Sequence, residues 1–223
     1  MTVVRPLSRS LLADRVRDHL LEGILNGRFP PDSRIVETQV ARELGTSQAP
    51  VREALRGLEG IGVVEYSPFR GARVRRPRRW EILEGYAVRS ALEMLAARLA
   101  VPRMSDADLA ELVELGDEMQ AGARAGDGRV VAEADAKFHG RIVEIAGNRT
   151  LQRTWRTLDP FSRTYLSLFV PGADPVWSAH LHTPILEALR RRDPDAIAAA
   201  VQAHFDEAAE NMARRWPDTE GTS

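Results

Sequence analysis

The sequence contains no cysteine, and this absence excludes several classes of protein. A chain without cysteine has no disulfide scaffold, no thiol nucleophile and no metal site ligated by Cys. No apolar run approaches the roughly 18 residues that a membrane span requires. The first ten residues also lack the apolar core of a signal peptide. We therefore expect a soluble, cytoplasmic protein.

Lysine is almost absent as well, and the charges are unevenly distributed along the chain. Of the 31 basic residues, only Lys137 is a lysine. Residues 1–79 carry a net charge of +6, whereas residues 80–223 carry −7. This contrast predicts two domains with different partners. The basic part suits nucleic acid or a membrane surface, although arginines on a solvated face would give the same count.

The first third of the chain has the element order of a winged helix-turn-helix. Apolar residues recur at helical spacing, and turn residues separate three helices from a β-hairpin. Ser8 or Ser10 is the candidate cap of the first helix, and Ser47 caps the third. The predicted elements are a helix ending near Leu25, helices over residues 37–44 and 47–60, and strands over residues 63–66 and 72–74.

A charged segment interrupted by proline, residues 75–79, follows the hairpin and marks the point where the net charge changes sign. It fits a solvated linker or a hinge that contacts phosphate. Every later segment reads as helical, with helices over residues 80–101, 106–125, 129–146, 150–169, 179–192 and 194–216. We predict a mainly α chain with a winged helix-turn-helix domain over residues 1–74, a linker over 75–79 and an all-α six-helix domain over 80–223.

In the first of these six helices, one apolar stripe is predicted to face the core. It consists of Leu83, Tyr86, Ala87, Leu92, Leu95, Ala96 and Leu99.

The third helix of the first domain is the candidate DNA-reading element. A helix fits the major groove of B-DNA, where its N-terminal side chains reach base edges. Gln pairs bidentately with adenine and Arg with guanine. A lone arginine on a helix is usually solvated, so the argument rests on Gln48, Arg52 and Arg56 sharing one outer face. The candidate contacts are Thr46, Ser47, Gln48, Arg52 and Arg56 on this helix, with Arg42 before it and Arg70 in the wing placed for phosphate or the minor groove.

The stretch Glu37–Leu58, which contains Pro-Val-Arg-Glu-Ala-Leu, resembles the winged-helix signature of the GntR family of bacterial transcription regulators. The resemblance implies that Arg52 contacts DNA and that Gly71 in the wing approaches the minor groove. Gln48 stands where the family often has arginine, and this departure concerns the operator sequence rather than DNA binding itself.

Histidine and aspartate residues form a second candidate site in the helical part of the chain. Asp135 and His139 are four positions apart and share one helix face. His182 and His204 lie on helices whose apolar residues face the core. Three imidazoles and one carboxylate that converge would suit Zn²⁺, Ni²⁺ or Mn²⁺ with open coordination positions. From the residues alone, hydrogen-bonded core histidines without a metal fit this pattern too.

The segments at residues 135–139, 146–148, 182–189 and 204–205 resemble the FCD ligand-binding domain of the FadR subfamily, in the six-helix form of the VanR-like group. The resemblance implies a divalent metal, with Zn or Ni ahead of Mn, held by one aspartate and three histidines. By position these are Asp135, His139, His182 and His204. His180 matches no ligand position and is expected at the surface or the rim of a pocket.

Arg89 and Glu93 match an Arg-x-x-x-Glu pattern of the same family, in which the arginine often faces the effector cavity. A buried guanidinium beside an open metal position would clamp a carboxylate bidentately. The alternative is an ion pair between Arg89 and Glu93 within one helix. Arg163 is a further candidate for binding the effector.

Together these observations predict a ligand-responsive DNA-binding regulator rather than an enzyme. It would be a homodimeric repressor that reads a pseudo-palindromic operator in double-stranded DNA, because two-fold sites match two-fold proteins. It would sense a small organic acid in a metal-containing helical pocket. A metal-dependent hydrolase with a basic docking domain is the alternative, although no carboxylate other than Asp135 is placed as a general base. A third hypothesis keeps the DNA-binding domain and assigns the histidines to the core.

Overall fold

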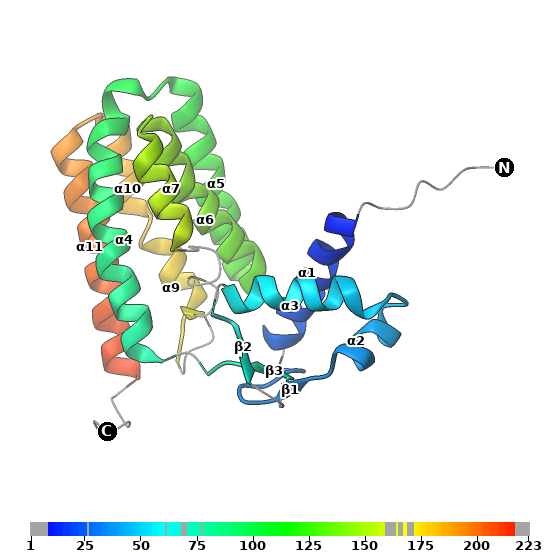
Figure 1. The fold of residues 1–223 in the computed structure, drawn as a ribbon. Coiled ribbons are helices and arrows are strands. Elements are labelled where there is room, and N and C mark those ends of the chain that lie inside the picture. The colour runs from blue at the N-terminus through cyan, green and yellow to red at the C-terminus, as the bar shows by residue number, and fades with distance from the viewer. Residues whose placement is uncertain are drawn as a thin grey trace. The chain divides into compact units, whose positions relative to one another are not determined.

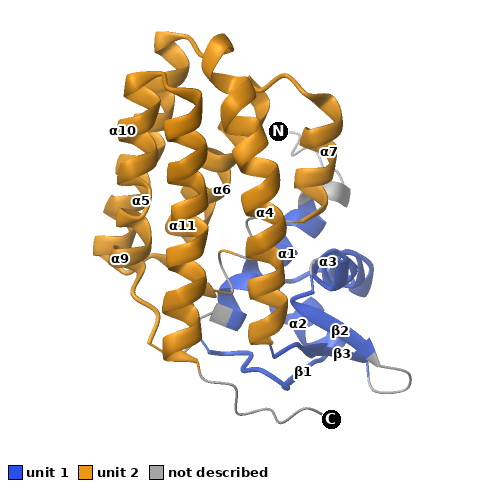
Figure 2. Cartoon of the chain, turned by 90° about the vertical axis from the view of Figure 1, so that its left-hand side faces the viewer, with its two compact units in different colours: residues 1–77 blue, residues 78–223 orange. Residues whose placement is uncertain are grey.

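The computed structural model describes residues 9–25, 27–60, 62–67, 71–76, 78–158, 164, 167–168 and 172–216. The chain divides into two compact units, Met1–Pro77 and Arg78–Ser223 (Figure 2). Within the described residues, the first unit combines helices with a small sheet, and the second is built of helices (Figure 1). The predicted fold class, a winged helix-turn-helix followed by an all-α domain, is confirmed.

The first unit has three helices and a three-stranded antiparallel sheet among its described residues. Its elements are α1 (Arg9–Leu25), β1 (Arg34–Ile35), α2 (Glu37–Glu43), α3 (Gln48–Gly60), β2 (Val64–Ser67) and β3 (Gly71–Val74). The strand order is β1-β3-β2, and Tyr66 lies opposite Ala72. Strand β1 is absent from the predicted elements because two residues are too few for an alternating pattern to be detected.

The core of this unit lies between α1 and α3, which pack against each other. Val51, Leu55 and Leu58 on α3 are fully buried, and Leu20 on α1 is buried with them. Their spacing along α3 places the apolar residues on one side and leaves the polar residues on the other. Ser10 lies inside α1, so it does not cap that helix, and Ser8 lies outside the described residues.

The second unit is a helical bundle in which α11 packs along α4 and α5 packs along α6 (Figure 1). Its described elements are α4 (Arg79–Ala100), a short 3-10 helix (Val101–Arg103), α5 (Asp106–Ala125), α6 (Gly128–Ile145), α7 (Arg149–Thr157), α9 (Pro175–His180), α10 (Thr183–Arg191) and α11 (Pro194–Arg215). Asn148 caps α7 by accepting from the backbone N–H groups of Thr150 and Leu151, both at 3.1 Å.

Two of the predicted helices differ from the structure. The helix predicted over residues 150–169 ends at Thr157, and residues 159–163 lie outside the described part of the chain. The helix predicted over residues 179–192 begins earlier and is interrupted, giving α9 and α10. Pro184 explains the interruption, since its ring clashes with the carbonyl four residues earlier and it has no N–H to donate. The break leaves His182 at the N-cap position of α10.

The inward face of α4 is also different from the prediction. Tyr86 and Ala96 are buried as predicted, but Leu95 is 47% exposed and Ala87 is exposed. The inward positions include Arg89 and Glu93, which are only 1% and 2% exposed. The predicted stripe was therefore wrong at Ala87 and Leu95, because a buried ion pair occupies part of the core face.

The segment predicted as a linker, residues 75–79, overlaps both units. The backbone N–H of Arg75 donates to the carbonyl of Val63 at 2.9 Å. Arg76 forms a 2.9 Å ion pair with Asp32. Helix α4 begins at Arg79. Most of this segment is thus ordered as part of one unit or the other.

Candidate functional site

Helix α3 exposes the side chains predicted to read DNA. Gln48, Arg52 and Arg56 are exposed, while Val51 and Leu55 between them are buried. This arrangement follows from helical periodicity, since the apolar positions face α1. The predicted outer face of the helix therefore exists in the structure and carries a polar surface of the kind that fits a major groove.

The other predicted DNA contacts surround this helix. Arg42 on α2 and Ser47 before α3 are exposed, and Thr46 is half-buried. Gly71 begins β3 with a φ of 75°, a left-handed conformation that glycine adopts without strain. Arg70 lies outside the described residues.

Two residues that sequence reasoning did not single out form a network with Arg52, Glu37 directly and Tyr66 through Glu37. Glu37, in the first turn of α2, accepts from Nη2 of Arg52 at 2.9 Å and from its Nε at 3.2 Å. The hydroxyl of Tyr66 on β2 donates to the other carboxylate oxygen of Glu37 at 3.1 Å. Burial, followed by the hydrogen bond to Glu37, raises the pKa of Tyr66 to about 12. Only the tertiary fold joins positions 37, 52 and 66, so no local spacing rule would have found them.

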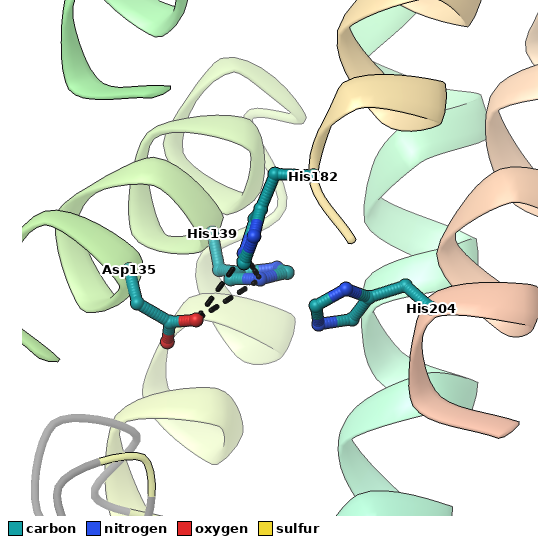
Figure 3. A group of neighbouring side chains, drawn as sticks. All are labelled: Asp135, His139, His182 and His204. Carbon is teal, nitrogen blue, oxygen red and sulfur yellow. Dashed lines mark hydrogen bonds and ion pairs between the residues drawn. The ribbon is translucent and has the colours of Figure 1, made fainter. Parts of the chain in front are cut away.

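The predicted metal ligands converge inside the second unit. Asp135 and His139 lie on α6, His182 lies at the break between α9 and α10, and His204 lies on α11. Each offers one ligand atom, and these atoms all lie within 4.8 Å of one another. Figure 3 shows the four side chains pointing into one shared space. All four are buried, with His204 the most exposed at 8%.

The distances within this cluster are short. Nε2 of His139 and Nε2 of His182 are 3.1 Å apart. Oδ1 of Asp135 lies 3.2 Å from Nε2 of His182 and 3.8 Å from Nε2 of His139. Nδ1 of His204 is buried and has no hydrogen-bond partner among the described residues.

The contacts of the Nδ1 atoms of His139 and His182 indicate which nitrogen of each ring faces the space between the four side chains. Nδ1 of His139 lies 2.5 Å from Oε2 of Glu93, and Nδ1 of His182 lies 3.2 Å from the carbonyl oxygen of Ala179. Both oxygens can only accept, so these contacts favour a proton on Nδ1 of each ring. The two Nε2 lone pairs then face each other and the carboxylate of Asp135. A cation between them satisfies all three acceptors, and the carboxylate behind His139 is the usual outer partner of a metal-bound histidine.

Arg89 and Glu93 on α4 contact the cluster from one side, through Asp135 and His139. Nε of Arg89 donates to Oε1 of Glu93 at 2.9 Å, so the predicted ion pair within α4 exists. Arg89 also donates to Oγ1 of Thr164 at 3.2 Å, and Thr164 donates to Oδ2 of Asp135 at 2.7 Å. The indole Nε1 of Trp155 donates to Oε1 of Glu93 at 2.7 Å. Nη2 of Arg89 has no hydrogen-bond partner among the described residues.

These contacts and burial together shift the pKa values of Glu93, Asp135 and His204. Burial by itself would raise the pKa of Glu93, but the charge of Arg89, the contact with His139 and the hydrogen bond from Trp155 lower it to about 2. Burial opposes ionisation of Asp135 too, but His139, His182 and Arg89 hold its pKa well below its usual range. Burial, with His182 and His139 nearby, lowers the pKa of His204 well below its usual value.

The charge balance also favours a cation. With neutral imidazoles, Arg89, Glu93 and Asp135 leave a net charge of −1 in a buried space. An uncompensated buried charge costs several kcal/mol, so a cation would relieve that cost. The donor set of imidazole and carboxylate suits a divalent first-row metal.

One further predicted position, His180, lies outside the ligand set, and another, Arg163, lies outside the described residues. His180 is exposed at the end of α9, which agrees with its exclusion from the ligand set. A small cavity of about 40 Å³ opens between α4, α9 and α11, where it is lined by Tyr86, Trp177 and Arg215 among others. The ring of Tyr86 packs against Phe205, the neighbour of His204, at a centroid distance of 5.8 Å.

The winged helix-turn-helix and the buried polar site of the helical unit together define a class, the DNA-binding transcriptional regulators with a helical ligand-binding domain. A family model described as "Bacterial regulatory proteins, gntR family" matches residues 12–74, and the model of the FCD domain matches residues 84–207. The chain therefore belongs to the GntR family and carries an FCD domain.

The chain is similar to regulators from several bacteria. It is 35% identical to a protein of Paenarthrobacter nicotinovorans named "Probable D-xylose utilization operon transcriptional repressor", over 89% of this chain and 87% of that protein. It is 26% identical to the transcriptional repressor RspR of Escherichia coli K12, over 86% of this chain and 85% of RspR. The relatives are transcriptional regulators, so the hydrolase alternative is not favoured and the chain is a regulator rather than an enzyme.

Solved structures share the fold. McbR/YncC of E. coli superposes with a TM-score of 0.72 at 22% identity, covering 92% of this chain and 98% of that one. A GntR regulator from Rhodococcus sp. RHA1 gives a TM-score of 0.75 at 22% identity, with the same coverage. Among the described helices, none has the length and apolar character to span a bilayer.

Proposed function

We propose that this chain is a repressor of the FadR subfamily that binds a pseudo-palindromic DNA operator as a homodimer and responds to a small organic acid. Residues 1–74 read DNA, residues 75–79 connect, and residues 80–223 bind the effector and dimerise. The exposed row of Gln48, Arg52 and Arg56 on α3 carries the DNA-binding part of this proposal. The names of the relatives support repression, since several are repressors of operons.

Replacing Arg52 with Ala tests the DNA-reading assignment. A bidentate contact between Arg and guanine is worth enough that its loss should weaken operator binding by about tenfold or more. Operator duplexes come from selection on random DNA by the wild-type protein, and gel-shift titration at fixed salt measures affinity. Arg124→Ala, at an exposed arginine on α5 in the second unit, is the control for loss of one positive charge. Undiminished affinity in Arg52→Ala would reject the assignment.

The sensing site is proposed to hold a divalent metal, Zn or Ni foremost and Mn third, on Asp135, His139, His182 and His204. The inward-facing Nε2 atoms of His139 and His182 support this assignment. When bound, the metal would supply open coordination positions to an anionic ligand. Glu93 and the carbonyl of Ala179 hold the two rings in the orientation that such coordination needs.

Arg89 supports an acid as the effector class. Its Nη2 atom is buried without a hydrogen-bond partner among the described residues, so it can donate to a carboxylate. With a divalent cation present, the cluster of Arg89, Glu93 and Asp135 has a net charge of +1, which a monocarboxylate would neutralise. The effector then alters DNA affinity only through its different affinities for the two arrangements of the protein.

One exposed face of α4 supports the homodimer. Trp80, Val88 and Leu95 are 50%, 47% and 47% exposed, and Ala87 and Ala91 lie among them. Exposed apolar rows of this kind mark interaction surfaces. A second copy of the chain is the partner that two-fold operator reading requires.

A double substitution on this face tests dimerisation. Val88→Glu with Leu95→Glu places two charges in the proposed interface and should convert a dimer into a monomer in sedimentation velocity. Val176→Glu changes an equally apolar residue, 39% exposed on α9, and should leave the dimer intact. A double variant that sediments as the wild type does would move the interface elsewhere.

A further inference from the structure

Among the arginines predicted to face DNA, Arg52 differs in its surroundings. Its guanidinium is hydrogen-bonded to Glu37, whereas Arg42 and Arg56 make no such contact within the described part of the chain. The side chain of Arg52 is nevertheless 53% exposed, and that of Glu37 is 20% exposed. An exposed ion pair adds little to stability, so the contact is better explained by what it does to the orientation of Arg52.

Glu37 uses both of its carboxylate oxygens, and Oε1 accepts from both partners because Nε of Arg52 also donates to it at 3.5 Å. Oε2 accepts from Nη2 and Nε of Arg52, and Oε1 accepts from the hydroxyl of Tyr66. The three residues come from α2, α3 and β2, so the network connects the helix-turn-helix to the sheet. Tyr66 keeps the carboxylate from rotating away, and its raised pKa keeps its proton available at any ordinary pH.

The geometry of the guanidinium determines which N–H donors of Arg52 are left to bind DNA. Glu37 occupies the edge formed by Nε and Nη2 of Arg52. Arginine has five N–H donors in a planar fork, so the end formed by Nη1 and Nη2 keeps its outward donors. The O6 and N7 acceptors of guanine form a pair that such an end-on fork matches.

We propose that Glu37 and Tyr66 are positioning residues that fix the guanidinium of Arg52 in the orientation required to read one guanine in the major groove. This inference rests on the proposed DNA-reading function of α3. The mechanism is preorganisation, because a side chain already held in its bound orientation loses less freedom when DNA binds. The network therefore contributes to base selectivity more than to general attraction for DNA.

The experiment uses the full-length protein and the duplex that the wild type selects from random DNA. Each G·C pair of the half-site is replaced by A·T in turn, and fluorescence anisotropy at fixed salt measures every affinity. Arg52→Ala identifies the base pair that Arg52 reads, as the position where discrimination disappears. The test variants are Glu37→Gln and Tyr66→Phe. Glu65→Gln is the matched control, because it removes a neighbouring exposed carboxylate from β2 on the face opposite Tyr66.

At the Arg52 base pair, we expect wild type and Glu65→Gln to discriminate by about tenfold or more. Glu37→Gln should lose most of this discrimination and Tyr66→Phe part of it, while both keep wild-type affinity for a duplex without the site. Thermal melting by circular dichroism checks that both variants are folded. Full discrimination in both variants, or tighter binding of the selected site by Glu37→Gln, would overturn the inference. A wild-type protein that selects no sequence would instead reject the proposed function, so the two failures are distinguishable.

Discussion

The two units of this protein contain the same small network in opposite environments. In the first unit, Arg52 is bound to Glu37, which also accepts from the hydroxyl of Tyr66. In the second, Arg89 is bound to Glu93, which also accepts from the indole of Trp155. The side chain of Arg52 is 53% exposed, whereas that of Arg89 is 2% exposed.

The difference teaches that burial decides what an arginine–glutamate pair contributes. In water the attraction between the two charges is screened, so the pair mainly orients the guanidinium, which suits a side chain that we propose contacts DNA. Inside the bundle the same two groups are costly to separate. There Glu93 orients the imidazole of His139, and Arg89 compensates the negative charge of Asp135. In our proposal, the first network orients a side chain that binds DNA, and the second lines a closed space that binds small charged ligands.

Removing the buried glutamate is expected to have the largest effect. Glu93→Leu removes the nearer carboxylate partner of Arg89 and leaves it only the 3.8 Å pair with Asp135. Breaking a buried pair in this way costs about 3–5 kcal/mol of the free energy of unfolding. Urea denaturation of chelator-treated protein, followed by far-UV circular dichroism, measures the loss.

The matched control is Glu133→Leu, which breaks a pair with the same spacing at the surface. Arg129 and Glu133 are 2.8 Å apart on α6, with side-chain exposures of 51% and 34%. Loss of this surface pair should lower the free energy of unfolding by less than about 1 kcal/mol. Similar small losses in both variants would contradict the distinction between buried and exposed pairs.

Helix α3, which we propose reads DNA, was predictable because the pattern that defines it is local in sequence. Helical spacing of Val51, Leu55 and Leu58 fixes the inward face, and the exposed face carrying Arg52 follows from it. Neither of the other two residues in the Arg52 network was predictable in this way. Glu37 and Tyr66 are 29 positions apart, and only the sheet and the turn between α2 and α3 bring them together.

The helical unit was predictable at Asp135 and His139, which share one turn, and at the other two histidines through family resemblance. The inward face of α4 was not. Hydrophobicity assigns Leu95 to the core and gives Arg89 no reason to be buried, yet the structure does the reverse. Charged residues can occupy inward positions of a helix when partners from other elements compensate them. Here Trp155 donates to Glu93, and Asp135 pairs with Arg89.

The exposed network is expected to show a smaller effect, at high pH. Burial and then the hydrogen bond to Glu37 raise the pKa of Tyr66 to about 12, with Glu37, Arg52 and Glu59 as the charged groups near it. The protonated form is favoured by folding, so this contribution to stability is complete below about pH 10, the pKa of a free tyrosine, and is lost as the pH rises toward 12.

Phenolate absorbance measures this titration directly. The difference between wild type and Tyr66→Phe should rise with a midpoint near pH 12 in the folded protein. The same difference in urea-unfolded protein should have its midpoint near the ordinary value of about 10. A folded-state midpoint near the ordinary value would mean that Tyr66 does not donate to Glu37.

The metal content of the protein tests the account of the buried site most directly. Untagged wild type, His139→Ala with His182→Ala, and His180→Ala as control are dialysed against Zn²⁺ or Ni²⁺, then against buffer, and analysed by mass spectrometry. The account predicts about one equivalent per chain in wild type and in His180→Ala, and less than about a tenth in the double variant, because a site that loses two of its imidazoles cannot compete for the ion. Metal-free wild type after this treatment would contradict it and would make the three histidines part of the core.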